Sequence, residues 1–193
     1  MATVRKGNQP VLLVVDMQVG VTAAPAWQAE RAIANAAVVV HRAREAGVPV
    51  VWVQHTDDEL PTGSALWQWV PVLEPADGEL RIHKQYNSAF EDTPLEAELA
   101  RLGATHIVLA GAASKWCIRA TAYAALERGY DLTLVSDAHT TRTMQLESGA
   151  VVEAESVVND LNVAMTWLAY PGRRSATATA AQADFFAVEG PTA

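Results

Sequence analysis

The sequence predicts a three-layer α/β/α domain with a mainly parallel central sheet. Short, continuously apolar runs alternate along the chain with longer segments that have helical periodicity. Continuous hydrophobicity is typical of strands that are buried on both faces. A repeated strand–helix–strand order favours parallel strands joined by right-handed crossovers, with helices on both faces of the sheet.

The first strand–helix–strand unit occupies the N-terminal part of the chain. The apolar run Val11–Val15 (VLLVV) predicts a buried strand that ends at Asp16. The Ala-rich segment Trp27–Ala46 has helical spacing and is followed by Gly47, a typical C-terminal stop. A second buried strand is predicted at Val48–Val53 (VPVVWV).

The later elements begin with a helix-capping sequence. Thr93-Pro94-Leu95-Glu96 combines a capping box with proline at the first helical position, and it predicts a helix that ends near Gly103. Gly129 is the predicted C-terminal stop of the later helix Trp116–Arg128. The remaining predicted elements are a strand at His106–Ala110, a helix at Trp116–Arg128, a strand at Leu132–Val135 and a helix at Glu147–Leu168.

Nothing in the sequence indicates a domain boundary, so residues 1–193 are predicted to form one domain. The segment Thr56–Leu80 has no predicted element and carries Trp67, Trp69 and three prolines. Loops of this length are usually functional, as lids or as interfaces. The tail Ser175–Ala193 is rich in Ala and Thr, and its last residues, EGPTA, are predicted to fray.

Composition argues against several classes of function. The formal net charge of −8 disfavours nucleic acid, because phosphates require clustered Lys and Arg, and it gives no reason to expect binding to an anionic membrane. The sequence shows no signal-peptide pattern and no apolar stretch of the roughly 18 residues that a transmembrane helix needs. The single cysteine excludes an internal disulfide. A cytoplasmic protein is therefore expected.

Two reactive side chains follow predicted strands. Ligands collect beyond the carboxyl ends of parallel strands, and Asp16 follows the first strand, where a buried carboxylate requires a partner. Cys117 follows a later strand and the turn Gly111–Ser114. A thiol at a helix N-terminus is expected to have a lowered pKa and amide donors for an oxyanion. An N-cap or salt bridge for Asp16 and an inert core position for Cys117 are the alternative interpretations.

Lys84 lies in the segment Arg81–Lys84, directly before the sequence QYNSAF. Most lysines are solvated, so this residue by itself carries little information. A lysine beside Cys117 and Asp16 would favour the thiolate and fix the orientation of the carboxylate.

In the three stretches around Asp16, Lys84 and Cys117, the chain resembles the isochorismatase-like cysteine hydrolase superfamily. The matching sequences are VLLVVDMQ, HKQYNSAF and THIVLAGAASKWCIRATAYAALERGYDLTLVSDAH, and the resemblance extends from Val11 to about Thr179. All three occur in the expected order, each placed by a predicted strand. The resemblance implies a three-layer fold and a hydrolytic activity.

The resemblance also implies roles for individual residues. Asp16, Lys84 and Cys117 would form a catalytic triad in which Asp16 takes the thiol proton and Cys117 forms a thioester with the substrate. A cis peptide bond at Ala112–Ala113 is implied as well. The backbone amides of Ala113 and Cys117 would form the oxyanion hole.

Two subfamilies of these hydrolases are distinguished by what the sequence lacks. Nicotinamidases carry a metal site with an Asp-x-His motif and a second His nearby, whereas here no histidine follows His55 until His83. True isochorismatases generally lack the cysteine. The resemblance therefore implies a hydrolase without metal or cofactor that cleaves the C–N bond of a small, neutral or weakly polar amide, carbamoyl or ureido compound. Hydrolysis of another bond type and a non-catalytic binding relative are the alternatives.

Several residues near the motifs are candidates for substrate contacts. The main candidates are Trp116, Gln18, His55, Tyr86 and Arg119. Aromatic residues equally form cores and interfaces, and residues at strand ends often have structural roles. The weaker candidates are therefore Trp27, Trp67, Trp69, Asp137 and His139.

A homo-oligomer, at least a dimer, is predicted from apolar sequence outside the expected core. The loop Thr56–Leu80 and the segment Val163–Tyr170 carry more hydrophobic surface than a monomer normally exposes. Relatives in the superfamily also commonly assemble.

Overall fold

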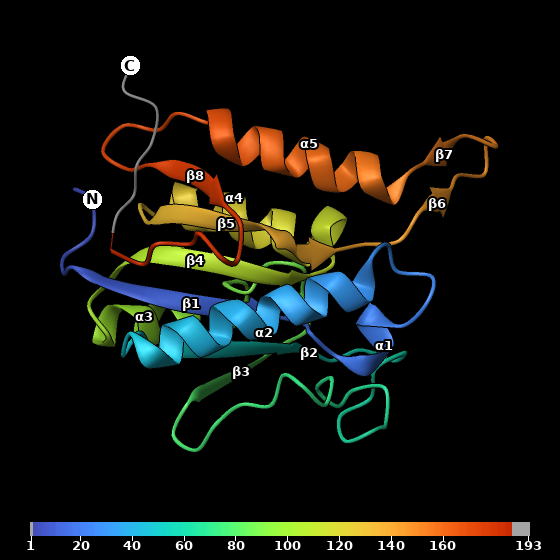
Figure 1. Cartoon of the computed structure of the whole chain (residues 1–193), viewed down its shortest axis with the longest axis horizontal. Coiled ribbons are helices and arrows are strands. Elements are labelled where there is room, and N and C mark those ends of the chain that lie inside the picture. Colours follow the sequence, from blue (N-terminus) through green and yellow to red (C-terminus); the bar gives the residue numbers. More distant parts are fainter. Residues whose placement is uncertain (1, 187–193) are drawn as a thin grey trace.

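A six-stranded sheet forms the centre of the computed structural model, which describes residues 2–186 (Figure 1). The strand order is β3-β2-β1-β4-β5-β8, and every neighbouring pair in this order is parallel. The predicted three-layer α/β/α fold class is confirmed. The strands are β1 (Gln9–Val15), β2 (Val50–His55), β3 (Leu80–Lys84), β4 (Ala104–Ala112), β5 (Asp131–Thr140) and β8 (Ser175–Ala178).

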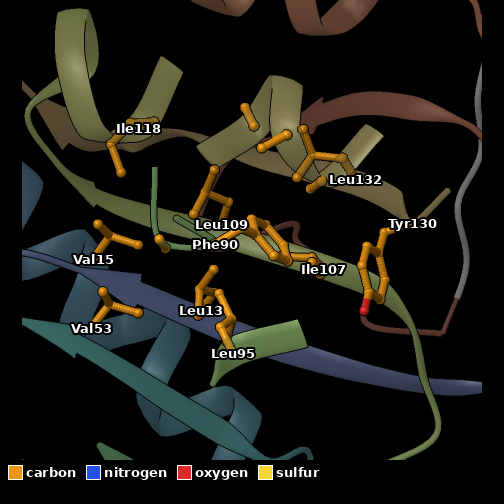
Figure 2. Packing of buried hydrophobic residues seen from close by; sticks show 14 of the residues in the cluster. Leu13, Val15, Val53, Phe90, Leu95, Ile107, Leu109, Ile118, Tyr130 and Leu132 are labelled. Carbon is orange, nitrogen blue, oxygen red and sulfur yellow. The ribbon is translucent and has the colours of Figure 1, made fainter. Parts of the chain in front are cut away.

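Helices pack on both faces of the sheet because alternate residues of each buried strand point to opposite sides. Leu12 and Val14 of β1 pack against α2, which lies on the near face in Figure 1. Leu13 and Val15 pack on the other side, in the core formed with α3, α4 and α5 (Figure 2). The helices are α1 (Val19–Thr22), α2 (Ala29–Glu45), α3 (Leu95–Arg101), the π-helix η1 (Ser114–Ile118), α4 (Arg119–Glu127) and α5 (Ala154–Trp167).

The direction of the chain through the sheet reverses between β1 and β4. From β1 the chain passes outward to β2 and β3, and from β4 it passes the other way to β5 and β8. Since the crossovers are right-handed, opposite directions put α2 and α4 on opposite faces. The carboxyl ends of β1 and β4 then leave a crevice between them, which is where open parallel sheets bind ligands.

Gly111 allows β1 and β4 to approach closely at this crevice. It pairs with Val15 and has φ +139°. A Cβ atom at this position would lie 2.0 Å from the Val15 carbonyl oxygen, so no other residue fits without moving a strand. Asp16 and Ala112 follow directly, which brings the two chain segments that carry the candidate residues together.

Two elements near the C-terminus differ from the prediction. The helix predicted at Glu147–Leu168 begins only with α5, because β6 (Met144–Gln145) and β7 (Val151–Val152) pair as an antiparallel hairpin around Gly149, whose φ is +84°. Part of the predicted tail forms β8, which pairs with β5. Residues 189–193, which are predicted to fray, lie outside the described residues.

The capping box predicted for α3 forms only in part. The Leu95 amide donates to Thr93 Oγ1 at 3.3 Å, as expected of a cap. The Glu96 carboxylate instead forms ion pairs with Arg5 and Arg128, which tie the N-terminal segment to this helix. Within residues 2–186, no helix combines the length and the hydropathy needed to cross a bilayer.

Candidate active site

Asp16 lies at the carboxyl end of β1 and is buried. Its φ of +51° is in the left-handed region, which Asp tolerates better than most residues, and its amide donates to the Val53 carbonyl at 2.8 Å. Burial raises the pKa of the Asp16 carboxyl above its ordinary value of 3.8, although the charge of Lys84 opposes this effect. The carboxyl is therefore a stronger base than an exposed aspartate.

Lys84 at the end of β3 joins the other two candidate residues. Its Nζ atom lies 2.6 Å from Asp16 Oδ2 and 3.2 Å from Cys117 Sγ. Although burial favours the neutral amine, the charge of Asp16 raises the pKa of Lys84, so the ammonium form persists at neutral pH. The structure thus brings together Asp16, Lys84 and Cys117, which are remote in sequence.

Cys117 lies within the π-helical turn η1 that follows β4. The turn is closed by the amides of Trp116 and Ile118, which both donate to the Ala113 carbonyl, and the peptide bond between Ala112 and Ala113 is cis. The expected low thiol pKa is wrong. Burial and the nearby Asp16 carboxylate raise the pKa of Cys117 to about 12, and they outweigh the favourable effect of Lys84.

The Lys84 ammonium is therefore the positive charge beside two acidic groups, the Asp16 carboxyl and the Cys117 thiol. Lys84 can balance one negative charge, and a carboxylate beside a thiolate would repel it in this buried site. Burial raises the pKa of both Asp16 and Cys117, so the two groups are not both ionised at neutral pH. Cys117 also lies near Asn87, with Sγ 4.0 Å from Oδ1.

A cavity of about 550 Å³ adjoins the Cys117 turn. Ala113, which precedes the turn, and Trp116, which lies within it, form part of the cavity wall, and Trp116 is half exposed. The remaining lining residues are Gly20, Val21, Ala23, Glu59, Leu60, Leu66, Lys115, Thr141, Arg142 and Met144.

Two cationic groups of this cavity have buried atoms without partners. Among the residues described, neither Lys115 Nζ nor Arg142 Nε has a hydrogen-bond partner. Arg142 Nη2 donates to the carbonyls of Gly20 and Ala23, which fixes the guanidinium at the cavity wall. Sequence reasoning missed both residues, because only the folded chain shows that they lack a counterion.

Of the five main candidates for substrate contacts, only Trp116 lines this cavity. Gln18 is fully buried, and its amide group hydrogen-bonds to the His55 amide and to the carbonyls of His55 and Trp67, so its role is structural. Arg119 forms an ion pair with Asp160 at 2.7 Å, away from the cavity. Tyr86 is exposed and also lies outside the cavity lining.

His55 contacts Lys84 rather than the cavity. Its Nδ1 atom lies 3.2 Å from Lys84 Nζ, and its Nε2 atom lies 3.0 Å from Asp57 Oδ2. Both ring nitrogens are therefore engaged. Within residues 2–186, no cluster of three His, Cys, Asp or Glu side chains is arranged to hold a metal ion.

The tryptophans of the long loop are structural. The Trp67 carbonyl accepts hydrogen bonds from Gln18 and Gln54, and its ring stacks on His83. Trp69 packs edge-on against Trp52. The segment between β2 and β3 is thus anchored at its middle, and it forms a fixed wall of the cavity.

The remaining weaker candidates are Trp27, Asp137 and His139. All three line a different, smaller cavity of about 230 Å³. His139 is buried between Ser114 and Asn162, with Nδ1 2.8 Å from Ser114 Oγ, and burial lowers its pKa to about 4. Asp137 Oδ1 accepts from the Ala180 amide. His139 therefore ties β5 to the turn that holds Cys117, and Asp137 ties β5 to the segment after β8.

Comparison with known proteins identifies similar sequences and folds. The isochorismatase domain model matches residues 10–165. Streptothricin hydrolase from Streptomyces noursei is 33% identical over 67% of this chain, and the chain spans only 54% of that protein's length. Maleamate amidohydrolase from Pseudomonas putida is 29% identical over 80% of this chain and 88% of its own length.

The fold is similarly matched among solved structures. The crystal structure of an isochorismatase from Pseudomonas putida superposes with a TM-score of 0.80 at 28% identity. The superposition covers 89% of this chain and 88% of the other. Fold and sequence therefore indicate the same family.

Proposed function

Since this chain belongs to the isochorismatase family, we propose that it is a cysteine hydrolase that cleaves the C–N bond of a small amide, carbamoyl or ureido compound. The observation that carries the proposal is the position of Lys84 Nζ, 2.6 Å from Asp16 Oδ2 and 3.2 Å from Cys117 Sγ, beside a cavity that fits a small molecule. The similarity to a maleamate amidohydrolase supports the same class of bond.

The proposed reaction begins with proton transfer from the Cys117 thiol to Asp16, whose raised pKa suits a general base. The sulfur attacks the substrate carbonyl carbon, and the backbone amides of Ala113 and Cys117 stabilise the oxyanion. Asp16 returns the proton to the leaving nitrogen, so ammonia or an amine departs and a thioester remains. Water, deprotonated by Asp16, then releases the acid and restores the thiol.

The proposed chemistry needs no metal ion or organic cofactor. Lys84 supplies the positive charge that balances the site, and the sulfur is the nucleophile in place of a metal-bound water. Before the attack Lys84 faces one negative charge, first on Asp16 and then on the Cys117 sulfur, and during the attack this charge passes to the oxyanion.

The two cationic side chains in the cavity wall, Lys115 and Arg142, indicate which charge the substrate carries. A buried cationic nitrogen without a partner is costly, so Lys115 and Arg142, both half-buried, favour an anionic ligand through Nζ and Nε. Glu59 in the same wall is solvent-exposed and offsets them only weakly. We therefore replace the expected neutral substrate with an amide or ureido compound that carries one carboxylate.

Lys115→Met tests this assignment, because methionine keeps the apolar stem and removes the charge. The variant is expected to lower kcat/KM for a carboxylated amide by about 10- to 100-fold, the value of a charge-assisted hydrogen bond, and to spare the matching neutral diamide. Arg119→Met, which removes a surface arginine paired with Asp160, is the control. Equal losses for both substrates would contradict a carboxylate site.

The proposed activity itself is tested by incubating the protein with a panel of small amides, ureido acids and lactams. Release of ammonium or amine is measured, with Cys117→Ala as the control for background hydrolysis. Turnover of one or more members by the unaltered protein alone supports the proposal. Release that is unchanged in the variant would overturn it.

A homo-oligomer remains part of the proposal. Val163 and Trp167 on α5 are exposed, Trp167 by 72%, and an apolar surface of this kind is typical of an interface. Light scattering at micromolar concentration is expected to give at least twice the 20.7 kDa of one chain, and Trp167→Ser is expected to lower that mass. A monomeric mass for the unaltered protein would contradict the prediction.

A further inference from the structure

Lys84 has a third contact that the proposed chemistry does not use. An ammonium group has three N–H donors and no acceptor. Two of these donors serve Asp16 and Cys117. Lys84 Nζ also lies 3.2 Å from His55 Nδ1, which takes the third donor. Because Lys84 can only donate, Nδ1 must accept, and the His55 ring must be neutral with its proton on Nε2.

Asp57 favours this same tautomer from the other side of the ring. His55 Nε2 lies 3.0 Å from Asp57 Oδ2, so the Nε2–H group donates to the carboxylate. Asp57 Oδ1 accepts from the amides of Glu59 and Leu60 at 2.9 and 2.8 Å. Although partial burial opposes ionisation, the Leu60 amide and His55 hold the pKa of Asp57 below its ordinary value.

The backbone of His55 is also fixed. Gln18 Oε1 accepts from the His55 amide at 2.8 Å, and Gln18 Nε2 donates to the His55 carbonyl at 3.0 Å. The ring therefore has a defined backbone position, a defined tautomer and two engaged nitrogens. Such a ring can hold a neighbouring ammonium in place.

We propose that His55 and Asp57 form a positioning dyad that locks the Lys84 ammonium between Asp16 and Cys117. The proposal rests on the proposed function, since it gives Lys84 a catalytic task. Asp57 also binds the amides of Glu59 and Leu60, two residues of the substrate cavity. The dyad thus connects the cavity wall to the triad without lining the cavity itself.

Asp57→Asn discriminates this role from a purely structural one. The amides of Glu59 and Leu60 require an oxygen, so the asparagine Nδ2 group would face His55 and force the ring into the Nδ1–H tautomer, which presents a donor to Lys84. We expect kcat to fall by about 10- to 100-fold with KM changed by less than about threefold. Asp57→Ala removes the loop cap but leaves the ring free to keep its tautomer, and we expect a smaller loss.

A structural role predicts the opposite order, because asparagine preserves the loop cap and alanine does not. Asp58→Asn is the matched control, since it makes the same change at the neighbouring, exposed position. A smaller kcat loss in Asp57→Asn than in Asp57→Ala would overturn the dyad.

The ring tautomer provides a test that does not require turnover. Nitrogen-15 NMR of the five histidines, with His55→Asn to assign the signal, is expected to show His55 with the proton on Nε2 in the unaltered protein. The proton is expected to move to Nδ1 in Asp57→Asn. A doubly protonated or Nδ1–H ring in the unaltered protein at neutral pH would overturn the dyad, whether or not any amide in the panel is hydrolysed.

Discussion

Replacing Cys117 with alanine is expected to lower kcat by about 10⁴- to 10⁶-fold. The proposed reaction passes through a covalent thioester, and the chain has no second cysteine that could replace this nucleophile. The residual rate would reflect binding and the oxyanion donors alone. Ammonium release from the best substrate of the panel measures the effect.

The fold is expected to survive this substitution. One lost sulfur atom leaves a small cavity, which we expect to cost about 1 kcal/mol of unfolding free energy. In a domain of this size that corresponds to a fall in Tm of about 2–4 °C. A folded Cys117→Ala protein that retained kcat would exclude Cys117 as the nucleophile.

The second large effect is expected for Asp16→Asn, with kcat/KM reduced by about 10²- to 10⁴-fold. Asparagine can neither accept the thiol proton nor return it to the leaving nitrogen, although loss of the Asp16 charge removes one of the two causes that raise the pKa of the Cys117 thiol. The variant also leaves the buried Lys84 ammonium without its ion-pair partner. A loss of about 3–5 kcal/mol in unfolding free energy is therefore expected as well.

The pH profile separates the chemical effect of Asp16 from this loss of stability. Because burial raises the pKa of Asp16, kcat/KM of the unaltered protein should fall on acidification through a pKa above the ordinary 3.8. This acid limb should be absent from the residual activity of Asp16→Asn, measured at a temperature where the variant is folded. Asp137→Asn, which makes the same change within β5 and away from Lys84 and Cys117, is the matched control and should keep the limb. An unchanged acid limb in Asp16→Asn would assign it to another group.

The central strands were predictable because each is buried on both faces and therefore contains a continuous, mainly apolar run. Val11–Val15 and His106–Ala110 lie within β1 and β4, and Val48–Val53 overlaps β2. The strand β8, with the sequence SATA, carries no such signal, because its place depends on pairing with β5. Similarly, Gly149 allowed a hairpin where the periodicity predicted a helix.

The positions of the site residues were predictable to a similar degree. Asp16 and Cys117 follow strands, and parallel strands end at one edge of a sheet, so their proximity follows from the topology. The pKa of Cys117 was not predictable, because it depends on burial and on the Asp16 charge rather than on the helix terminus. The contacts of His55 and the unpartnered cations Lys115 and Arg142 likewise depend on distances between remote segments.

The distribution of the triad over β1, β3 and the turn after β4 has a consequence for refolding. Residues 16, 84 and 117 meet only after four neighbouring strands have paired in the order β3-β2-β1-β4. Such pairings join segments far apart in sequence, and contacts of this kind form slowly. Recovery of enzymatic turnover after dilution from denaturant should therefore lag behind the recovery of helical circular dichroism, so that activity reports when the centre of the sheet is complete.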